Sequence, residues 1–113
     1  MTNTKRLLIA NIVELVKHWS LLRGSFNAAY ILNKMPPEYV RQFLVHVKKS
    51  TGDFIHDNVD ENDDGTFRLF SWLQVELYDM NKTAEARELV HHIDRCIHVL
   101  TNLLLYVTDA AKE

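Results

Sequence analysis

Apolar residues recur every three or four positions along the first part of the chain, which predicts a helix over residues 4–22. Thr4 is a suitable N-cap for this helix, and Gly24 is a suitable stop. The positions that form its apolar stripe are Leu8, Ile12, Leu15, Trp19 and Leu22.

Two adjacent prolines divide the next part of the chain. We expect a short helix over residues 25–34 that ends before Met35, because a residue preceding proline avoids the helical region. Pro37 suits the first turn of a third helix, which either stops at Gly52 or continues through it at a cost of about 1 kcal/mol. The stripe of this third helix comprises Val40, Phe43, Leu44, Val47, Thr51, Phe54, Ile55 and Val59.

The segment that follows the acidic loop at residues 60–65 has two interpretations. Leu69, Leu73, Leu77 and Met80 have helical spacing, whereas residues 54–59 could instead pair with 66–70 as a β-hairpin. A lone hairpin is only marginally stable in water, so we favour the helix. A last helix, from about residue 83 to 107, is predicted by a long seam of Ala86, Leu89, Val90, Ile93, Ile97, Leu100, Leu104 and Val107.

These elements predict an all-α fold, a small antiparallel bundle of four to five helices in a single domain spanning residues 1–113. The first and last helices have the broadest stripes and are expected at the centre, with Trp19 and Ile93 buried. Only 3 Gly and 2 Pro are present, too few for a turn-rich β-sandwich or barrel. The single cysteine, Cys96, excludes an internal disulfide framework and is expected to be a small core residue.

Charge is distributed unevenly along the chain. Residues 1–52 have a balance of +6 and residues 53–113 a balance of −8, which gives the net charge of −2. Because the basic residues are scattered, we expect the two halves to attract each other, within one fold or across a dimer, rather than to form a basic face for an acidic partner. The net charge gives no general attraction to nucleic acid. The apolar run after Arg6 ends at Glu14, too short for a membrane span, so we expect a cytoplasmic protein without a membrane segment.

The acidic loop contains the most specific local pattern. Asp60, Asn62 and Asp64, followed by Gly65, match the first half of a calcium-binding EF-hand loop. The twelfth position is Ser71, where such loops have a bidentate glutamate. A calcium-responsive module is therefore only an alternative, and the simpler interpretation is a set of acidic residues placed favourably before a helix N-terminus.

An arginine followed by a histidine four to six residues later resembles the motif of HEPN-type ribonucleases, which are also small helical bundles. Arg87 and His92 have this spacing, as do Arg41 and His46. The resemblance implies that the arginine stabilises phosphate charge and that the histidine acts on a ribose hydroxyl. A chain of this composition contains about one such match by chance, so an active or inactive ribonuclease is a second alternative.

Other histidines offer weaker possibilities. His91, Asp94 and His98 share one side of the last helix, but this spacing covers about 10 Å of helix rise and is too long for one metal ion. An exposed charged stripe is the favoured interpretation. We therefore expect no cofactor and no enzymatic activity.

The leading prediction is a non-enzymatic helical regulator or inhibitor that binds another protein. When the stripe from Leu69 to Met80 faces the core, four large side chains point outward or sideways: Phe67, Trp72, Val75 and Tyr78. Interface cores favour such residues, so we predict a partner-binding surface there. Leu7 and Leu21 form a second apolar surface on the first helix, and we expect one of the two surfaces to close a homodimer.

Overall fold

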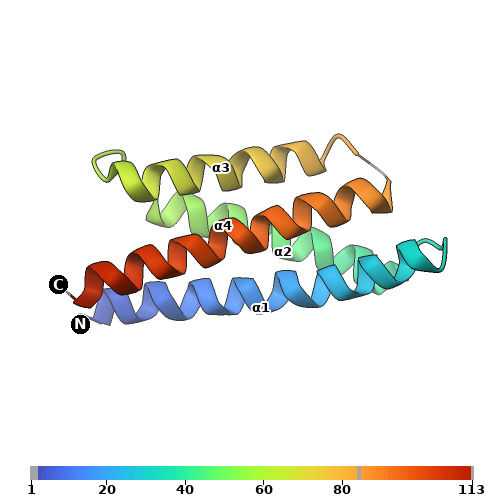
Figure 1. Cartoon of the computed structure of the whole chain (residues 1–113), viewed down its shortest axis with the longest axis horizontal. Helices are drawn as coiled ribbons and strands as arrows, with labels where there is room; N and C mark the ends of the chain where they lie inside the picture. The colour runs from blue at the N-terminus through green and yellow to red at the C-terminus, as the bar shows by residue number, and fades with distance from the viewer. Residues whose placement is uncertain (1–2, 84, 113) are drawn as a thin grey trace.

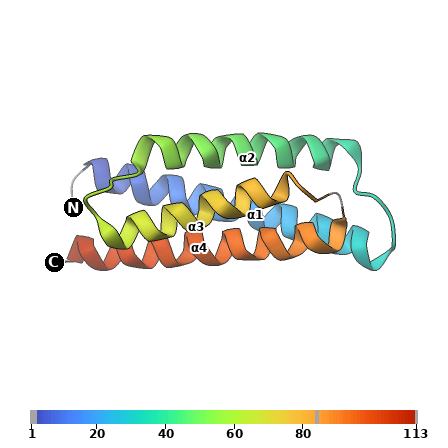
Figure 2. The same cartoon turned by 90° about the horizontal axis from the view of Figure 1, so that it is seen from above.

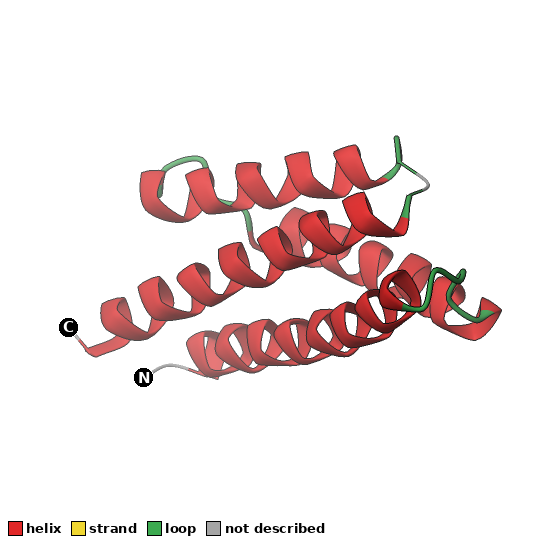
Figure 3. Cartoon of the chain, turned by 45° about the vertical axis from the view of Figure 1, so that its right-hand side comes forward, coloured by secondary structure: helices red, strands yellow, loops and turns green. Residues whose placement is uncertain are grey.

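The chain folds into four helices, and the predicted all-α bundle is confirmed (Figure 1). The structure is a computed structural model that describes residues 3–83 and 85–112. The helices are α1 (Asn3–Ile31), α2 (Glu38–Asn58), α3 (Asp64–Met80) and α4 (Ala86–Lys112). Helices and loops account for all of the described residues, as Figure 3 shows.

Successive helices run antiparallel and form a closed ring around one core (Figures 1 and 2). Each helix packs against two others: α1 and α3 each contact both α2 and α4. The most extensive interface joins α1 to α4, which confirms the central place predicted for the first and last helices. The bundle measures 48 × 21 × 19 Å, and both termini lie at the same end of its long axis.

The first helix is longer than the sequence predicts. The expectation of a stop at Gly24 and a separate helix over 25–34 was wrong, as was Thr4 as an N-cap, because α1 begins at Asn3 and continues to Ile31. Phe26 and Ala29 continue the buried stripe in phase with Leu22. Burial of Phe26, which stabilises the fold by roughly 1.5–3 kcal/mol, outweighs the cost of about 1 kcal/mol for a glycine inside a helix.

The end of α1 is set by Asn33, the one described residue other than glycine with a positive φ, 52°. The Lys34 N–H donates to the Ala29 carbonyl at 2.9 Å, and the Asn33 N–H donates to the Tyr30 carbonyl at 3.0 Å. This pair of bonds is a Schellman motif, which satisfies carbonyls that a helix end leaves unpaired. Pro36 and Pro37 then carry the chain to the start of α2.

Residues 54–70 form a helix–loop–helix, and the alternative of a β-hairpin was wrong. Helix α2 passes through Gly52 and ends at Asn58, and α3 starts at Asp64. The rings of Phe54 and Phe70, whose centroids are 5.7 Å apart, pack across the two helices. Such a contact between helix faces buries both rings, which an isolated hairpin could not do.

Trp19 lies at the centre of the core and, like Ile93, is fully buried as predicted. Its indole N–H donates to the Thr51 hydroxyl at 3.0 Å, and that hydroxyl donates to the Val47 carbonyl at 2.7 Å. The largest polar group of the α1–α2 interface is therefore satisfied without water. Because Thr51 is also fully buried, this bond fixes the register of α1 against α2.

Helix α4 buries a line of residues slightly different from the predicted seam. Ile93, Leu100 and Val107 are buried as expected, but Cys96 and Leu103 are more deeply buried than Ile97 and Leu104. The reason is that α4 packs against both α1 and α3, so its buried surface is broader than one heptad seam and is centred between these two neighbours. Cys96 is the small core residue that the sequence predicts.

One ion pair joins the basic half of the chain to the acidic half across the principal interface. The guanidinium of Arg23 on α1 meets the carboxylate of Asp94 on α4. Both side chains are about half exposed, so this pair contributes little stability on its own. It joins the two longest helices at the rim of the core.

Replacing Trp19 by alanine should destabilise the protein by about 3–5 kcal/mol, because the change opens a large cavity and leaves Thr51 with one partner fewer. Trp72, which is 41% exposed, provides a matched control. We expect Trp72→Ala to cost about 1 kcal/mol or less. Urea denaturation followed by circular dichroism measures both, and similar losses in the two variants would contradict this description of the core.

Candidate functional site

The outer side of α3 carries the four side chains predicted to bind a partner, and all four are solvent-exposed. The exposed fractions are 37% for Phe67, 41% for Trp72, 54% for Val75 and 59% for Tyr78. Helix α3 uses its inner side against α2 and α4, which leaves the opposite side bare. We call Phe67, Trp72, Val75 and Tyr78 the α3 face.

Neighbouring groups hold the two larger aromatic rings of the α3 face in place. Trp72 meets the ring of His98 on α4 edge to face, with centroids 5.9 Å apart. The ammonium group of Lys82 lies 4.3 Å from the centre of the Tyr78 ring, within the range of a cation–π contact. The α3 face is therefore a preorganised surface on a helix, with basic residues Lys82 and Arg68 beside its apolar groups.

The end of α3 is held to α2 by a hydrogen bond from the Lys48 ammonium to the Asn81 side chain. Partial burial beneath this contact lowers the pKa of Lys48 from its usual value. The contact places Lys48, in the middle of α2, beside the last turn of α3. The first part of α2 therefore extends beyond the end of α3.

The acidic loop serves as a helix cap in this structure. Asp63 is the N-cap of α3, and its carboxylate accepts from the Thr66 N–H at 3.4 Å. The Asp60 carboxylate accepts from the Asn62 N–H at 2.9 Å, and Asp64 lies in the first turn of α3. Across the described residues, no three His, Cys, Asp or Glu side chains are grouped in a way that could hold a metal ion. Asp60 and Asn62 thus lie in the turn before α3, and Asp64 is the first residue of that helix.

Gly65 has a role that its place in the calcium-loop pattern does not suggest. Its φ is not positive, so it makes no left-handed turn. A Cβ at this position would lie 2.6 Å from the ring of Tyr106 on α4. The tyrosine ring lies directly over the first turn of α3, where its hydroxyl donates to the Asp63 carboxylate at 3.1 Å, so a side chain at position 65 would displace the ring.

The pKa of Asp63 is shifted by two opposing effects. Desolvation of the carboxyl acts to raise the pKa, but hydrogen bonds from the Thr66 backbone and the Tyr106 hydroxyl, with smaller ones from the Thr66 side chain and the Gly65 backbone, outweigh it. The net effect is a pKa below the usual value. The charged form of Asp63 therefore stabilises the folded state.

A buried carboxylate between α3 and α4 is the polar feature that the sequence analysis missed. Glu76 is only 4% exposed; one of its oxygens lies 2.9 Å from His92 Nδ1, and the other accepts from Arg95 Nη1 at 3.5 Å. An acidic residue in phase with Leu73 and Leu77 was the available signal. The cluster pairs a charge that burial would otherwise make very costly, and it ties α3 to α4.

The structure does not bring Arg87 and His92 together. His92 is engaged by Glu76, whereas Arg87 lines a separate hollow with Tyr30 and Asn33 at the end of the bundle. No hydrogen bond or ion pair joins Arg87 to His92 within the described part of the chain. The other matching pair is also divided, because Arg41 contacts Glu38 and His46 stacks on Phe43.

Cys96, His92 and Glu76 have the residue types of a nucleophile, a base and an orienting acid, but not the required accessibility. The Cys96 side chain is fully buried. Burial, and secondarily the charge of Glu76, raise the pKa of the Cys96 thiol far above its ordinary value. The thiol is therefore protonated and shielded from any substrate, which is the opposite of an activated nucleophile.

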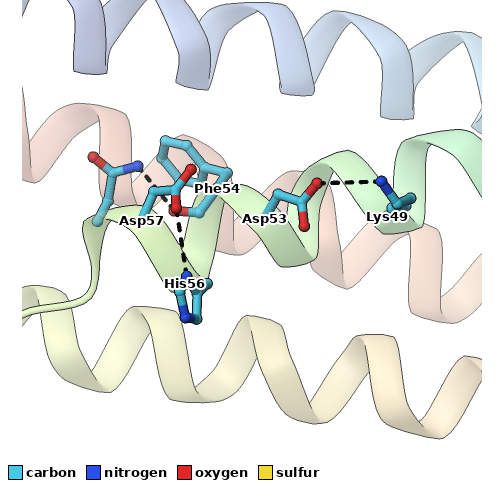
Figure 4. A network of polar contacts seen from close by, with 6 residues as sticks. Lys49, Asp53, Phe54, His56 and Asp57 are labelled. Carbon is cyan, nitrogen blue, oxygen red and sulfur yellow. Dashed lines mark hydrogen bonds and ion pairs between the residues drawn. The ribbon is translucent and has the colours of Figure 1, made fainter.

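A hollow of about 380 Å³ between α1 and α2 is lined by three acidic residues, Glu14, Asp53 and Asp57. Each of them has a partner on its own helix. Glu14 pairs with His18 at 3.0 Å, Asp53 pairs with Lys49 at 3.7 Å, and Asp57 pairs with His56 at 3.4 Å. Figure 4 shows the two pairs on α2. Each carboxylate thus contacts a neighbour on its own helix along the exposed surface, and only Asp53 has a lysine as its partner.

The remaining candidates from the sequence lie on exposed surfaces. Asp94 is engaged by Arg23, and His98 contacts Trp72 and Asn102, so His91, Asp94 and His98 do not form one site. Leu7 and Leu21 are 63% and 59% exposed on α1. None of the helices, over the residues that the structure describes, has the length and apolar content needed to cross a membrane.

No protein family, curated protein or solved structure matches this chain. The geometry of the site therefore stands on the residues of the chain itself.

Replacing Asp63 by alanine should destabilise the protein by about 1 kcal/mol at neutral pH, because the change removes the N-cap of α3 and the acceptor of the Tyr106 hydroxyl. The lowered pKa fixes the sign of the pH dependence. The stabilisation is complete above the unfolded pKa of about 3.9 and is lost as the pH falls through the lower folded value. Urea denaturation between about pH 7 and pH 2 should show the difference from wild type shrinking in acid. Glu61→Ala, in the same loop, is the control, and equal losses in both variants would refute this role for Asp63.

Cys96 should resist thiol reagents in the native protein, because its side chain is buried and its thiol is protonated. We expect labelling by a chromogenic disulfide reagent at neutral pH to be at least about 100-fold slower than in denaturant, at the rate of local opening. Stoichiometric labelling of the folded protein within seconds would show that Cys96 is accessible and reactive.

Proposed function

We propose that this protein is a non-enzymatic helical interaction protein, a small regulator or inhibitor that binds another protein through the α3 face. The observation that carries the proposal is the exposure of four large apolar side chains, 37% to 59%, on the outer side of a single helix. Aromatic residues on a preorganised surface supply much of the binding energy of protein interfaces.

The rigidity of the α3 face supports this proposal. Trp72 and Tyr78 already have contacts with His98 and Lys82 that restrict their rings, so binding loses little side-chain entropy. The helix itself is fixed at its start by Asp63 and at its end by the bond from Lys48 to Asn81. A partner therefore meets a surface that needs little rearrangement.

The charges beside the α3 face indicate the chemistry of the partner. Arg68 and Lys82 lie beside Val75 and Tyr78, and Asp64 and Asp79 lie on the same side of α3, so a complementary surface has an apolar ridge bordered by charges of both signs. We propose that the partner is a largely apolar protein surface rather than nucleic acid. The free, buried thiol of Cys96 suits a reducing compartment, and we propose that binding takes place in the cytoplasm.

Binding through the α3 face predicts which variants lose affinity for the partner and which do not. The Trp72→Ala/Tyr78→Ser variant should bind a purified partner at least about 10-fold more weakly than wild type, because aromatic anchors dominate interface energetics. Leu7→Ser/Leu21→Ser, which changes exposed leucines on α1, should bind normally. The partner is first captured by a photoreactive residue placed at position 75, and proteins captured equally by the same residue placed at position 13 are discarded as non-specific. The affinity of the purified partner for each variant is then measured by calorimetry.

The salt dependence provides a further readout of the same experiment, since pairing of Arg68 and Lys82 with carboxylates should weaken as ionic strength rises. Circular dichroism checks that each variant is folded. Undiminished binding by the Trp72→Ala/Tyr78→Ser variant, or equal losses in both double variants, would overturn the proposal.

A further inference from the structure

The bundle is incomplete at the end opposite the termini. Helix α3 has 17 residues, whereas α1 has 29, and α3 stops beside Lys48 in the middle of α2. Three helices continue beyond it: the end of α1, the start of α2 and the start of α4. Figure 2 shows the start of α2 and the loop that precedes it extending past the last turn of α3.

An apolar groove lies between α2 and α4 at this end. It encloses about 260 Å³ and is lined by Phe26, Met35, Leu44, Val45, Ala86 and Leu89, among others. Arg41 is the one charged residue in its lining. Val45 and Met35 are each 65% exposed, so solvent reaches the apolar wall of the groove.

The tip beside the groove carries an unusual number of exposed apolar side chains. Five large ones fall within ten residues of sequence: Tyr30, Ile31, Leu32, Met35 and Tyr39, with exposed fractions from 48% to 73%. The Schellman motif at Asn33 and the two prolines hold this segment in place, and its large apolar side chains remain exposed. We call these five residues together with Val45 the bundle tip.

The exposed area of the bundle tip is large for a lone chain. At roughly 200 Å² for a fully exposed large side chain, its six residues present about 600–800 Å². For comparison, the largest single contiguous apolar patch of a typical monomer is about 300–600 Å². Two such surfaces packed together bury roughly 1,200–1,600 Å², which is the range of a specific protein interface.

We infer that the bundle tip is the interface of a homodimer, in which the groove of each copy receives apolar side chains from the tip of the other. The charges around the tip favour a second copy over an acidic or basic partner. Lys34, Arg41 and Arg87 are balanced there by Glu38, Glu85 and Glu88. Such a rim offers groups of both signs that can pair between two copies related by a two-fold axis.

The dimer interface and the α3 face use different helix surfaces. The tip is formed by the end of α1, the start of α2 and the start of α4, whereas α3 contributes none of its residues. Each copy in the dimer therefore keeps its α3 face free. The inference holds whether or not the α3 face binds a partner.

Two matched valines separate the two surfaces experimentally. Val45, on the bundle tip, is 65% exposed, and Val75, on the α3 face, is 54% exposed. Light scattering and sedimentation over a range of concentrations should show a wild-type dimer. Val45→Glu should raise the dimer dissociation constant by about 100-fold or more, because it buries a carboxylate in an apolar interface, whereas Val75→Glu should leave it unchanged.

A second variant tests whether loss of the dimer results from unfolding of the chain rather than from a change in the interface. Met35→Ser, in the loop outside the helices, should weaken the dimer in the same direction while the circular dichroism spectrum stays that of wild type. A wild-type protein that remains monomeric at millimolar concentration would overturn the inference. So would a dimer that survives both Val45→Glu and Met35→Ser, or one that Val75→Glu dissociates instead.

Discussion

The hydrogen bond between the Trp19 indole and the Thr51 hydroxyl is the constraint on which the arrangement of this bundle depends. Indole has one donor, and burying it without an acceptor costs more than most single packing contacts contribute. Thr51 supplies that acceptor only when α1 and α2 have one particular rotation and register. Apolar contacts alone would tolerate neighbouring registers, so this polar pair specifies which of the similar packings is formed.

Periodicity predicted most of the fold because helix stripes depend on local spacing alone. The stripes that contain Trp19 and Ile93 placed both residues in the core, and the centre of the bundle followed from their breadth. The predicted stop at Gly24 was wrong because helix propensity is a local property, whereas burial of Phe26 against other helices stabilises the continued helix. Propensity is a weak prior wherever tertiary packing opposes it.

The candidate site was predictable only in part. The outward direction of Val75 and Tyr78 followed from helix geometry once Leu73 and Leu77 were placed inside. The pairing of Glu76 with His92 did not follow, because it needs the rotation of α3 against α4, which no sequence spacing encodes. Gly65 shows the same limit, since the ring that packs over it comes from Tyr106, 41 positions later in the sequence.

The dominance of the α1–α4 interface has a consequence for how the chain folds. Its two most strongly packed helices are the first and the last, so their contacts have the greatest sequence separation and close the longest loop. During synthesis, α1 emerges long before the helix that covers most of its apolar stripe. Until α4 has been synthesised, the apolar stripe of α1 is either exposed to solvent or covered only by α2, through the contact between Trp19 and Thr51. The chain can therefore fold cooperatively only after its last quarter, which contains α4, has been synthesised.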